Sequence, residues 1–434
     1  MPVPQRATLV LPSTGAFDSR AWRVAGSLVG RGHTVTIVAR LGPGLPADET
    51  APEGHRILRV AVDPVDGLPG PVRGLARRLR PRRGPTGTRG TAASEPSPDR
   101  PTRGLRRLPA AAWRLIAIGL TVRAQQLATR HRAPVADLVH AMAYMGIPVG
   151  LDLGRRDGAP VVYDARDIYT EARNIARLPG PLRRLFARIE RGWAHRADRV
   201  ITVNDPYADE LTHRLRVERP LVVLNCSLRR EPPATRPDRL REALGLPSDR
   251  RTVLYHGGLT RDRGIEELIA AIPHVPDAQL VLLGYGDLEA DLRRRAADPA
   301  SDGRISLLPA VPPAELIEWV ASADVVAMPI QPTTLNHRLT TPNKLFEAIA
   351  AGVPVVASDL PGMAPIVRST GCGVVVDPTD PAAIAAALRD ILDAPAERRA
   401  ALAAAIRAAQ DEYHWERQME RLLAEYGRLT GRPW

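Results

Sequence analysis

The chain contains 60 lysines and arginines, and only one of them, Lys344, is a lysine. That lysine lies in "TTPNKLFEAIAAGVPVVASD", residues 340–359, three residues before Glu347. Pro342 suits the first turn of a helix, where backbone N–H groups and the helix dipole attract an anion. An ammonium in that turn is unfavourable unless a phosphate binds. We therefore expect Lys344 to contact a phosphate and Glu347 to accept hydrogen bonds from ribose hydroxyls. The alternative is an exposed pair between the two residues, worth only ~0.2–0.5 kcal/mol.

A second stretch, "YHGGLTRDRGIEELIAAI" at residues 255–272, combines glycines and arginines between a strand and a helix. Paired glycines followed by cations at such a junction are typical of a diphosphate cradle, and a tight turn with surface arginines is the alternative. "LLGYGDL" repeats the pattern more weakly with Gly284 and Gly286. The candidate residues of the first stretch are Gly257, Gly258, Arg261 and Arg263.

In the first half of the chain, polar residues follow several apolar, strand-like runs, where they are expected to line a ligand site. A strand-end histidine such as His140 is as often a structural hydrogen-bonding residue as a catalyst, and both readings stay open. The candidates are Gly15, Asp18, Arg20, His140, Tyr144, Arg166, Asp167 and Glu171.

Strand and helix patterns that alternate along the chain must position these residues. The opening reads strand, helix, strand, and continuous apolar strands alternate with helical patterns, which predicts parallel sheets covered on both faces. A turn-rich passage over residues 229–237 interrupts the alternation, which then starts afresh. At 434 residues, two doubly wound α/β domains facing each other across a cleft are the natural prediction. The expected boundaries are 1–225, 226–408 and a final helix at 409–434.

Most of the formal charge of +12 lies in residues 73–107, which hold eleven arginines against two acids. This segment is rich in Pro, Gly, Ser and Thr, so residues 70–110 are expected to form a basic, mobile insertion. Together with the helix-like residues 105–126, it also fits a surface for anionic lipid heads. Nucleic acid is disfavoured because no aromatic residues interleave with the arginines.

Composition also bears on the cellular location. Cys226 and Cys372 lie far apart, outside any metal-ligand spacing, which favours a reducing cytoplasm without disulfides or zinc. The start of the chain lacks the pattern of a secretion signal, and the apolar run from Pro109 is too short to span a bilayer. We expect a cytoplasmic protein that acts at the inner face of the cell membrane.

The motifs "YHGG", "GYGDL", "ASADVVAMPI" and "PNKLFEAIAAGVPVVASD" together resemble the retaining glycosyltransferases of family four, in the branch with a PNKLFE-type motif. The resemblance implies the GT-B fold, with two Rossmann-like domains. It also implies a nucleotide-sugar donor in the second domain, an acceptor in the first, a last helix that returns to the first domain, and no metal or other cofactor.

Matched position by position, the resemblance implies that Glu347 binds the donor ribose. It places Arg263 where a lysine usually contacts the diphosphate, and Gly15 in the loop near the phosphates. Three family residues are replaced here, by Leu339, Gly258 and Arg166. The implied catalytic groups are Lys344, Arg263 and His140. The implied donor-binding residues are Gly15, Gly257, Gly258, Arg261, Arg263, Gly284, Gly286, Val311, Asn343, Lys344, Leu345 and Glu347. The implied acceptor-side residues are Asp18, Arg20, Tyr144, Arg166, Asp167 and Glu171.

The leading hypothesis is therefore transfer of a sugar from a nucleotide-diphosphate sugar to an acceptor hydroxyl. The acceptor would be a glycan, a lipid-linked molecule or a small molecule. Only the basic segment and residues 105–126 favour lipid-linked or cell-envelope glycans. A nucleotide-sugar epimerase of the same fold and a catalytically silent sugar-nucleotide binder remain alternatives. A nicotinamide oxidoreductase is disfavoured because "LPSTGAFDSR", after the first strand, lacks the GxGxxG pattern.

Overall fold

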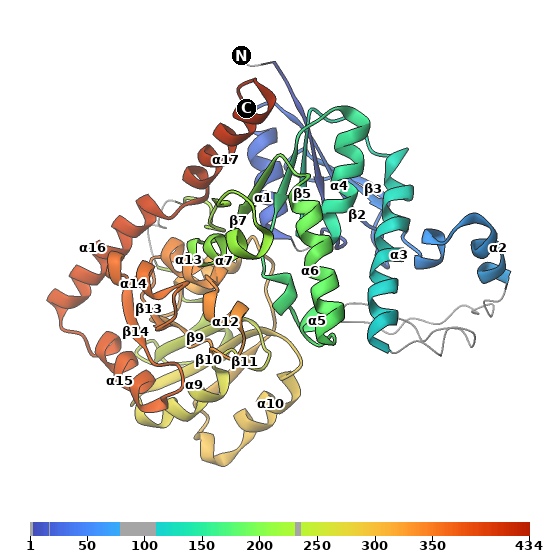
Figure 1. Cartoon of the computed structure of the whole chain (residues 1–434). Coiled ribbons are helices and arrows are strands. Elements are labelled where there is room, and N and C mark those ends of the chain that lie inside the picture. Colours follow the sequence, from blue (N-terminus) through green and yellow to red (C-terminus); the bar gives the residue numbers. More distant parts are fainter. Residues whose placement is uncertain (1–2, 17, 79–109, 231–235) are drawn as a thin grey trace. The chain divides into compact units, whose positions relative to one another are not determined.

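A computed structural model describes residues 3–16, 18–78, 110–230 and 236–434 (Figure 1). The chain forms two compact units, each built around its own sheet. Unit 1 comprises Met1–Thr202, Ala208–Val222 and Leu422–Trp434, and unit 2 comprises Val203–Tyr207 and Val223–Arg421. The last helix, α17 (Trp415–Thr430), therefore begins in unit 2 and ends in unit 1. Two doubly wound α/β units confirm the predicted fold class.

The described part of unit 1 contains an eight-stranded sheet in the order β3-β4-β2-β1-β5-β6-β7-β8. All neighbours are parallel except the antiparallel pair β3 and β4. The predicted opening is present as β1, α1 and β2, whereas β3, β4 and β8 were not predicted because they are short or carry charged residues. The strands are β1 (Arg6–Val10), β2 (Thr34–Arg40), β3 (Asp48–Thr50), β4 (Arg56–Val60), β5 (Leu138–Met142), β6 (Val161–Asp164), β7 (Arg199–Thr202) and β8 (Leu221–Val222).

The helices of unit 1 correct one expectation about the basic insertion. Residues 73–78 are not loop, because Pro71 occupies the first turn of α2 (Gly70–Arg78) and the helix runs on through them. Residues 79–109, which hold most of the predicted insertion, lie outside the described part. The other helices are α1 (Ser19–Val29), η1 (Pro64–Gly67), α3 (Ala110–Arg130), α4 (Ala143–Asp157), η3 (Tyr169–Glu171), α5 (Arg173–Ala176), α6 (Gly180–Ala194) and α7 (Asp205–Leu215). Among the described residues, no helix has the length and apolar character needed to cross a membrane.

The described part of unit 2 has a six-stranded, fully parallel sheet in the order β11-β10-β9-β12-β13-β14. Its strands are β9 (Arg251–Gly258), β10 (Ala278–Tyr285), β11 (Ile305–Leu308), β12 (Val325–Met328), β13 (Val355–Ser358) and β14 (Gly373–Val376). Its helices are α8 (Arg239–Leu244), α9 (Ile265–Ala271), η4 (Ile272–His274), α10 (Glu289–Ala297), η5 (Pro299–Ser301), α11 (Leu316–Ala321), α12 (Leu335–Leu339), α13 (Asn343–Ala351), α14 (Ala364–Thr370), α15 (Pro381–Leu392) and α16 (Ala396–Glu412). The strand β11 was not predicted.

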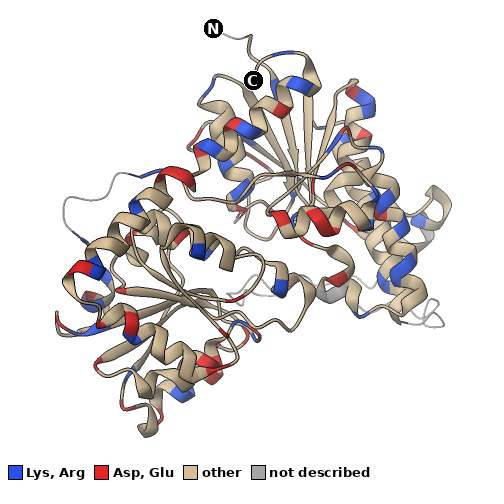
Figure 2. Cartoon of the chain, turned by 60° about the vertical axis from the view of Figure 1, so that its left-hand side comes forward, with Lys and Arg blue, Asp and Glu red and all other residues tan. Residues whose placement is uncertain are grey.

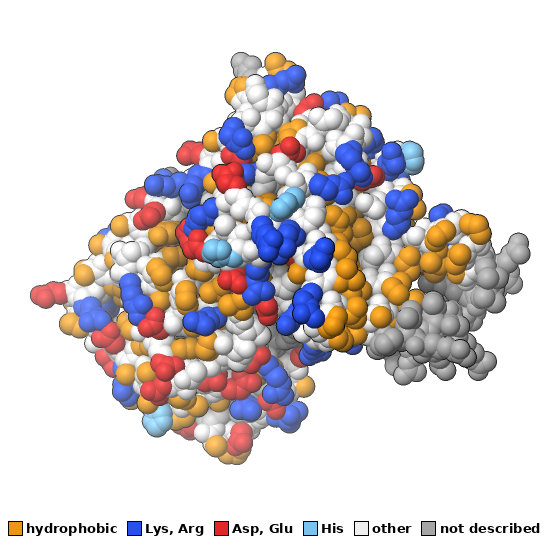
Figure 3. Space-filling model, in the orientation of Figure 1, with side chains coloured by type: hydrophobic (Ala, Val, Ile, Leu, Met, Phe, Trp, Pro, Cys, Tyr) orange, Lys and Arg blue, Asp and Glu red, His pale blue; other side chains and the backbone are white. Residues whose placement is uncertain are grey.

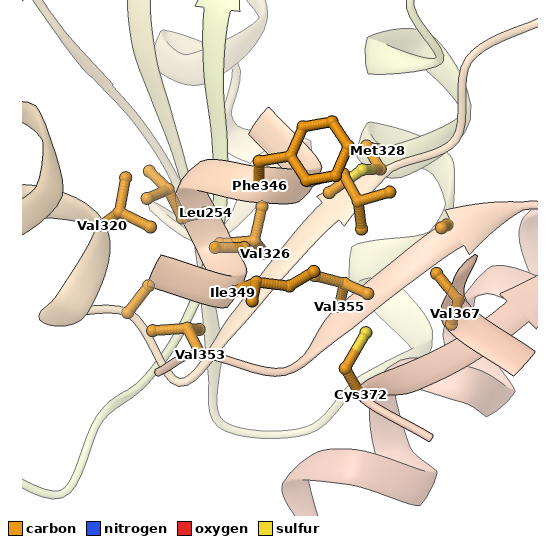
Figure 4. Close-up of a cluster of buried hydrophobic side chains, with 14 of the residues drawn as sticks. Leu254, Val320, Val326, Met328, Phe346, Ile349, Val353, Val355, Val367 and Cys372 are labelled. Atoms are coloured by element: carbon orange, nitrogen blue, oxygen red, sulfur yellow. The ribbon is translucent and has the colours of Figure 1, made fainter. Parts of the chain in front are cut away.

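Two buried clusters cover the two faces of the unit 2 sheet, as the period of two along a strand requires. Leu254 of β9 joins the cluster under α13, whereas its neighbours Val253 and Tyr255 join the cluster under α9 and α15. Figure 4 shows Phe346 and Ile349 of α13 packed with side chains of β12 and β13 in the first cluster. Charged residues lie mainly on helices and loops, and the strands are mainly uncharged (Figure 2).

Candidate functional site

The ammonium of Lys344 lies over an aromatic ring at the end of β9. Its Nζ is 3.6 Å from the centre of the Tyr255 ring. The Tyr255 hydroxyl donates a hydrogen bond to the Gly258 carbonyl at 2.8 Å, which holds the ring under the glycine turn. A Cβ atom built on Gly257 would lie 3.9 Å from Lys344 Nζ, so the cation is next to the turn. The structure thus brings together the two motifs that sequence analysis treated as separate phosphate signals.

The surroundings of Lys344 disfavour its charge. Burial, and to a smaller extent nearby Arg263, lower the pKa of Lys344 to about 7, although Glu347 opposes the shift. The side chain is only partly buried by accessible area, so solvent still reaches this group. A cation destabilised in this way is stabilised when an anion binds beside it.

The start of α13 offers further groups to an anion. Pro342 precedes the helix, no described side chain caps the first turn, and that turn holds no acid. The carbonyl of the Asn343 side chain accepts a hydrogen bond from the Asn225 amide at 2.8 Å. Uncapped N–H groups, the positive end of the helix dipole and an ammonium therefore converge on one point.

His256 belongs to the "YHGG" motif but was not predicted from the sequence to be a site residue. Its side chain is 2 % exposed, and its Nδ1 lies 3.6 Å from Glu347 Oε2. Its Nε2 has no hydrogen-bond partner among the described residues. Burial lowers the pKa of His256 to about 3, with a further contribution from Lys344, so the ring is neutral. The only signal in the sequence is a histidine directly before paired glycines at a strand end.

The glycines of the candidate site divide into two kinds. A Cβ atom on Gly284 would lie 1.9 Å from the Gly257 carbonyl oxygen, and one on Gly286 would lie 2.2 Å from that of Leu259. These two glycines therefore allow β9 and β10 to end in close contact. A Cβ atom on Gly258 would meet nothing within 4 Å, and this residue is exposed. Gly258 is the position where a ligand can approach the backbone.

The remaining predicted donor residues differ in exposure. Arg261 is exposed and Arg263 partly buried, and neither forms an ion pair within the described part of the chain. Leu345 is fully buried in the core, which corrects the prediction for its side chain, because the apolar face of α13 is needed for packing. Val311 is partly buried and packs against the same cluster, and its predicted role in donor binding stays a prediction.

In unit 1, Asp18 and Arg166 form a bidentate ion pair with distances of 2.8 and 2.9 Å. Asp18 also accepts a hydrogen bond from the Ala21 N–H and so caps α1. Burial alone would raise the pKa of Asp18, but Arg166 and the cap hold it below its ordinary value. Gly15, on the preceding loop, has φ +76° and accepts a hydrogen bond from Trp22 Nε1 at 2.6 Å.

Two predicted site residues of unit 1 belong to a buried network instead. Arg20 is 1 % exposed and donates to Asp164 at 2.6 Å, and His140 Nε2 lies 3.2 Å from the same carboxylate. The other ring nitrogen of His140 faces the Tyr426 hydroxyl on α17. With both nitrogens engaged and no exposed surface, His140 is not placed to exchange a proton with a substrate, and Arg20 does not line a ligand site. Burial of their side chains corrects both predictions.

The other acceptor-side candidates lie near the ends of β5 and β6. Tyr144 packs its ring against Tyr169 and Phe186, with centroids 5.0 and 5.3 Å away. Glu171 pairs with Arg214 at 2.9 Å, whereas Asp167 is exposed. Over the residues that the structure describes, no three His, Cys, Asp or Glu side chains are grouped to hold a metal ion.

Comparison with known proteins decides the family. Residues 15–226 match the model "Glycosyl transferase 4-like domain", and residues 250–394 match "Glycosyl transferases group 1". A D-inositol 3-phosphate glycosyltransferase of Xylanimonas cellulosilytica is 30 % identical over 311 residues, which cover 68 % of this chain and 73 % of that protein. The chain belongs to glycosyltransferase family four.

A second relative of this family-four glycosyltransferase has a name that specifies both a donor and an acceptor. The GDP-mannose-dependent monoacylated alpha-(1-6)-phosphatidylinositol monomannoside mannosyltransferase of Corynebacterium glutamicum is 35 % identical over 205 residues, 45 % of this chain and 52 % of that protein. Among solved structures, sucrose-phosphate synthase from Thermosynechococcus elongatus superposes with a TM-score of 0.70 and 21 % identity, covering 98 % of this chain and 99 % of that one. The enzyme therefore has the GT-B fold, and the resemblance seen in the sequence is confirmed.

Proposed function

We propose that this glycosyltransferase moves a hexose, with retention of configuration, from a nucleotide-diphosphate sugar bound in unit 2 to an acceptor hydroxyl. The observation that carries the proposal is Lys344, a partly buried ammonium with a lowered pKa at the uncapped start of α13. The Tyr255 ring and Glu347 offset only part of the cost of burying this cation, and a bound diphosphate would supply the missing counter-charge.

The diphosphate leaving group accounts for the groups around Lys344. Cleavage of the bond between the anomeric carbon and the phosphate oxygen leaves negative charge on the phosphate. Preorganised cations and N–H dipoles at that point lower the barrier. In the proposal, Lys344, Arg263 and the first-turn amides of α13 supply this stabilisation, and the phosphates approach the open side of Gly258.

Glu347 and His256 fit the ribose of the donor. Glu347 accepts hydrogen bonds from the two ribose hydroxyls, one turn of α13 beyond Lys344. His256 is neutral and buried beside this carboxylate, and its role in the proposal is to hold Glu347 in position. Neither group needs a metal ion, and the proposed mechanism is metal-independent.

The acceptor hydroxyl attacks the anomeric carbon on the face from which the diphosphate leaves. A carbon–oxygen bond to the acceptor forms as the bond to phosphate breaks, and the acceptor proton passes to the departing phosphate oxygen. The acceptor class proposed is a lipid-linked or cell-envelope glycan, used at the inner face of the cell membrane. The name of the Corynebacterium relative, which specifies a phosphatidylinositol mannoside, supports this class, whereas the Xylanimonas relative is named for inositol 3-phosphate, a small soluble acceptor.

Donor binding and transfer test the proposal separately. A thermal-shift panel of UDP, GDP, ADP and dTDP sugars identifies the donor, because a ligand that binds the native state raises its stability. The donor found is then incubated with and without phosphatidylinositol-derived acceptors. Transfer that requires Lys344 is the expected result. Conversion of the donor sugar without any acceptor would instead show an epimerase, and no stabilisation by any member of the panel would contradict a donor site.

A further inference from the structure

Helices α3 and α6 of unit 1 carry cations without exposed anions. The two helices are in contact, and the span 177–196, which includes α6, holds six arginines and one acid, Glu190. Glu190 is buried and accepts a hydrogen bond from the Tyr163 hydroxyl at 2.9 Å. The span 110–132, which includes α3, holds four arginines and no acid. All the exposed charges that these two spans contribute are therefore positive.

The same surface exposes large aliphatic side chains. Leu185 and Ile189 of α6 are 48 % and 41 % exposed, and Ile116 and Leu127 of α3 are 40 % and 37 % exposed. Their spacings of four and eleven residues put each pair on one face of its helix. In Figure 3, a band of apolar side chains with arginines beside it lies over the region where Figure 1 labels α6 and α3.

Arginines accompany the aliphatic residues on these faces. Arg184 and Arg188 flank Leu185 and Ile189 on α6, and Arg123 lies between Ile116 and Leu127 on α3. All three arginines are exposed, and none forms an ion pair within the described ranges. An arginine of this kind can lay its apolar stem along a bilayer and keep its charge at the headgroups.

An open depression adjoins the end of α6. It has a volume of about 450 Å³ and is lined by Arg188, Arg191, Gly192, His195 and Arg216. Arg191 donates to the Arg214 carbonyl and His195 to the Leu215 carbonyl, which fixes that wall. Arg188 and Arg216 have no acidic partner in the described residues and leave their charge for a bound anion such as a phosphate.

We infer that this surface of α3 and α6 docks onto a bilayer that contains anionic phospholipids, with lipid phosphates in the basic depression. Aliphatic side chains among exposed arginines are typical of interfacial membrane binding, and arginines near an anionic surface add electrostatic attraction. A nucleic acid fits less well, because the protruding apolar residues are aliphatic and do not stack on bases. The inference does not depend on the proposed transfer reaction, because vesicle binding needs neither donor nor acceptor.

Vesicle co-sedimentation of the full chain tests the inference. Wild-type protein should bind vesicles of phosphatidylglycerol and phosphatidylcholine but not vesicles of phosphatidylcholine alone. The double variants Arg184→Glu/Arg188→Glu and Leu185→Asp/Ile189→Asp should each weaken binding at least tenfold. The matched control Arg417→Glu/Arg421→Glu reverses the charge of two exposed arginines of α17, which form no ion pair with any described residue, and it should bind like wild type. Unchanged thermal unfolding would show that all three variants fold.

Several outcomes would overturn the inference. These are equal binding to neutral vesicles, no binding of wild type to anionic ones, or equal losses in the α6 and α17 variants. Binding of wild type to a single-stranded oligonucleotide without binding to vesicles would assign the surface to a soluble polyanion. Sugar transfer without vesicle binding would refute this inference and leave the proposed transfer reaction intact. Vesicle binding without transfer would support this inference and contradict the proposed transfer reaction.

Discussion

Lys344 Nζ lies 3.6 Å from the centre of the Tyr255 ring, although the two residues come from different motifs of unit 2. The ring face stabilises the cation by about 0.5–2 kcal/mol, which offsets only part of the cost of its burial. The pKa of Lys344 therefore still falls to about 7. This pair is the structural basis for the first two predictions.

Replacing Lys344 with methionine should separate stability from activity. The folded pKa of Lys344 is below its ordinary value of 10.5, so the folded protein resists protonation and the ammonium is destabilising at pH 7 and below. Lys344→Met should raise stability by about 2 kcal/mol, after a discount for its partial exposure. Turnover should fall about 100-fold or more, because a cation at the leaving group is lost. Calorimetry and initial rates measure the two effects, and an active Lys344→Met enzyme would contradict the assigned role.

Donor binding should take up a proton near neutral pH. Because the diphosphate favours the charged ammonium, affinity should be constant well below pH 7 and fall about tenfold per pH unit above it. Titration calorimetry with the nucleotide sugar chosen by the thermal-shift panel, in buffers of different ionisation enthalpy, measures the uptake directly, because a diphosphate esterified at both ends does not itself titrate near neutral pH. In Lys344→Arg the charge no longer titrates, so its remaining affinity should not vary with pH. A wild-type affinity that stays flat from pH 6 to 9 would rule out this titration.

Two glycines of the β9–β10 edge should respond differently to alanine. The Cβ atom of Gly258→Ala enters open space, so folding should change by less than about 1 kcal/mol while donor affinity falls. Gly284→Ala puts a Cβ atom 1.9 Å from the Gly257 carbonyl oxygen at φ +154°, which should destabilise unit 2 by about 3 kcal/mol. Thermal unfolding and nucleotide titration of both variants provide the comparison. Full donor affinity in Gly258→Ala would mean that the phosphates do not approach this turn.

Glu190 should make the stability of unit 1 depend on pH. Burial raises the pKa of Glu190 to about 7, although the Tyr163 hydroxyl donates to it. Its favourable contribution is therefore complete below its ordinary pKa of 4.5 and is lost as pH rises through about 7. Glu190→Gln keeps the hydrogen bond and removes the charge, so it should be more stable than wild type by about 3 kcal/mol at pH 8 and similar at pH 4.5. Urea unfolding at both values measures this, with exposed Glu420→Gln as the control. The same difference at both pH values would show that ionisation is not its cause.

Sequence analysis located the main elements because periodicity and strand-end chemistry are local properties. The apolar runs ending at Gly258 and Tyr285 are strands, and the helix that carries Lys344 and Glu347 starts directly after Pro342. Short or charged strands such as β3 and β4 carry no such pattern. The α2 backbone over residues 73–78 was also missed, because composition typical of loops does not prevent a helix.

The sequence by itself determined two α/β units with a cation at a helix start, and its motifs predicted a glycosyltransferase, because motifs and their spacing lie in contiguous residues. Only the tertiary structure decided which polar residues face solvent and which are enclosed. Arg20 contacts Asp164, 144 positions away in the chain, and His140 contacts Tyr426, 286 positions away. Both predicted site residues therefore belong to a buried network. Likewise, the burial that lowers the pKa of Lys344 comes from β9 and its neighbours. Desolvation depends on every element packed around a group, and a linear pattern does not encode that enclosure.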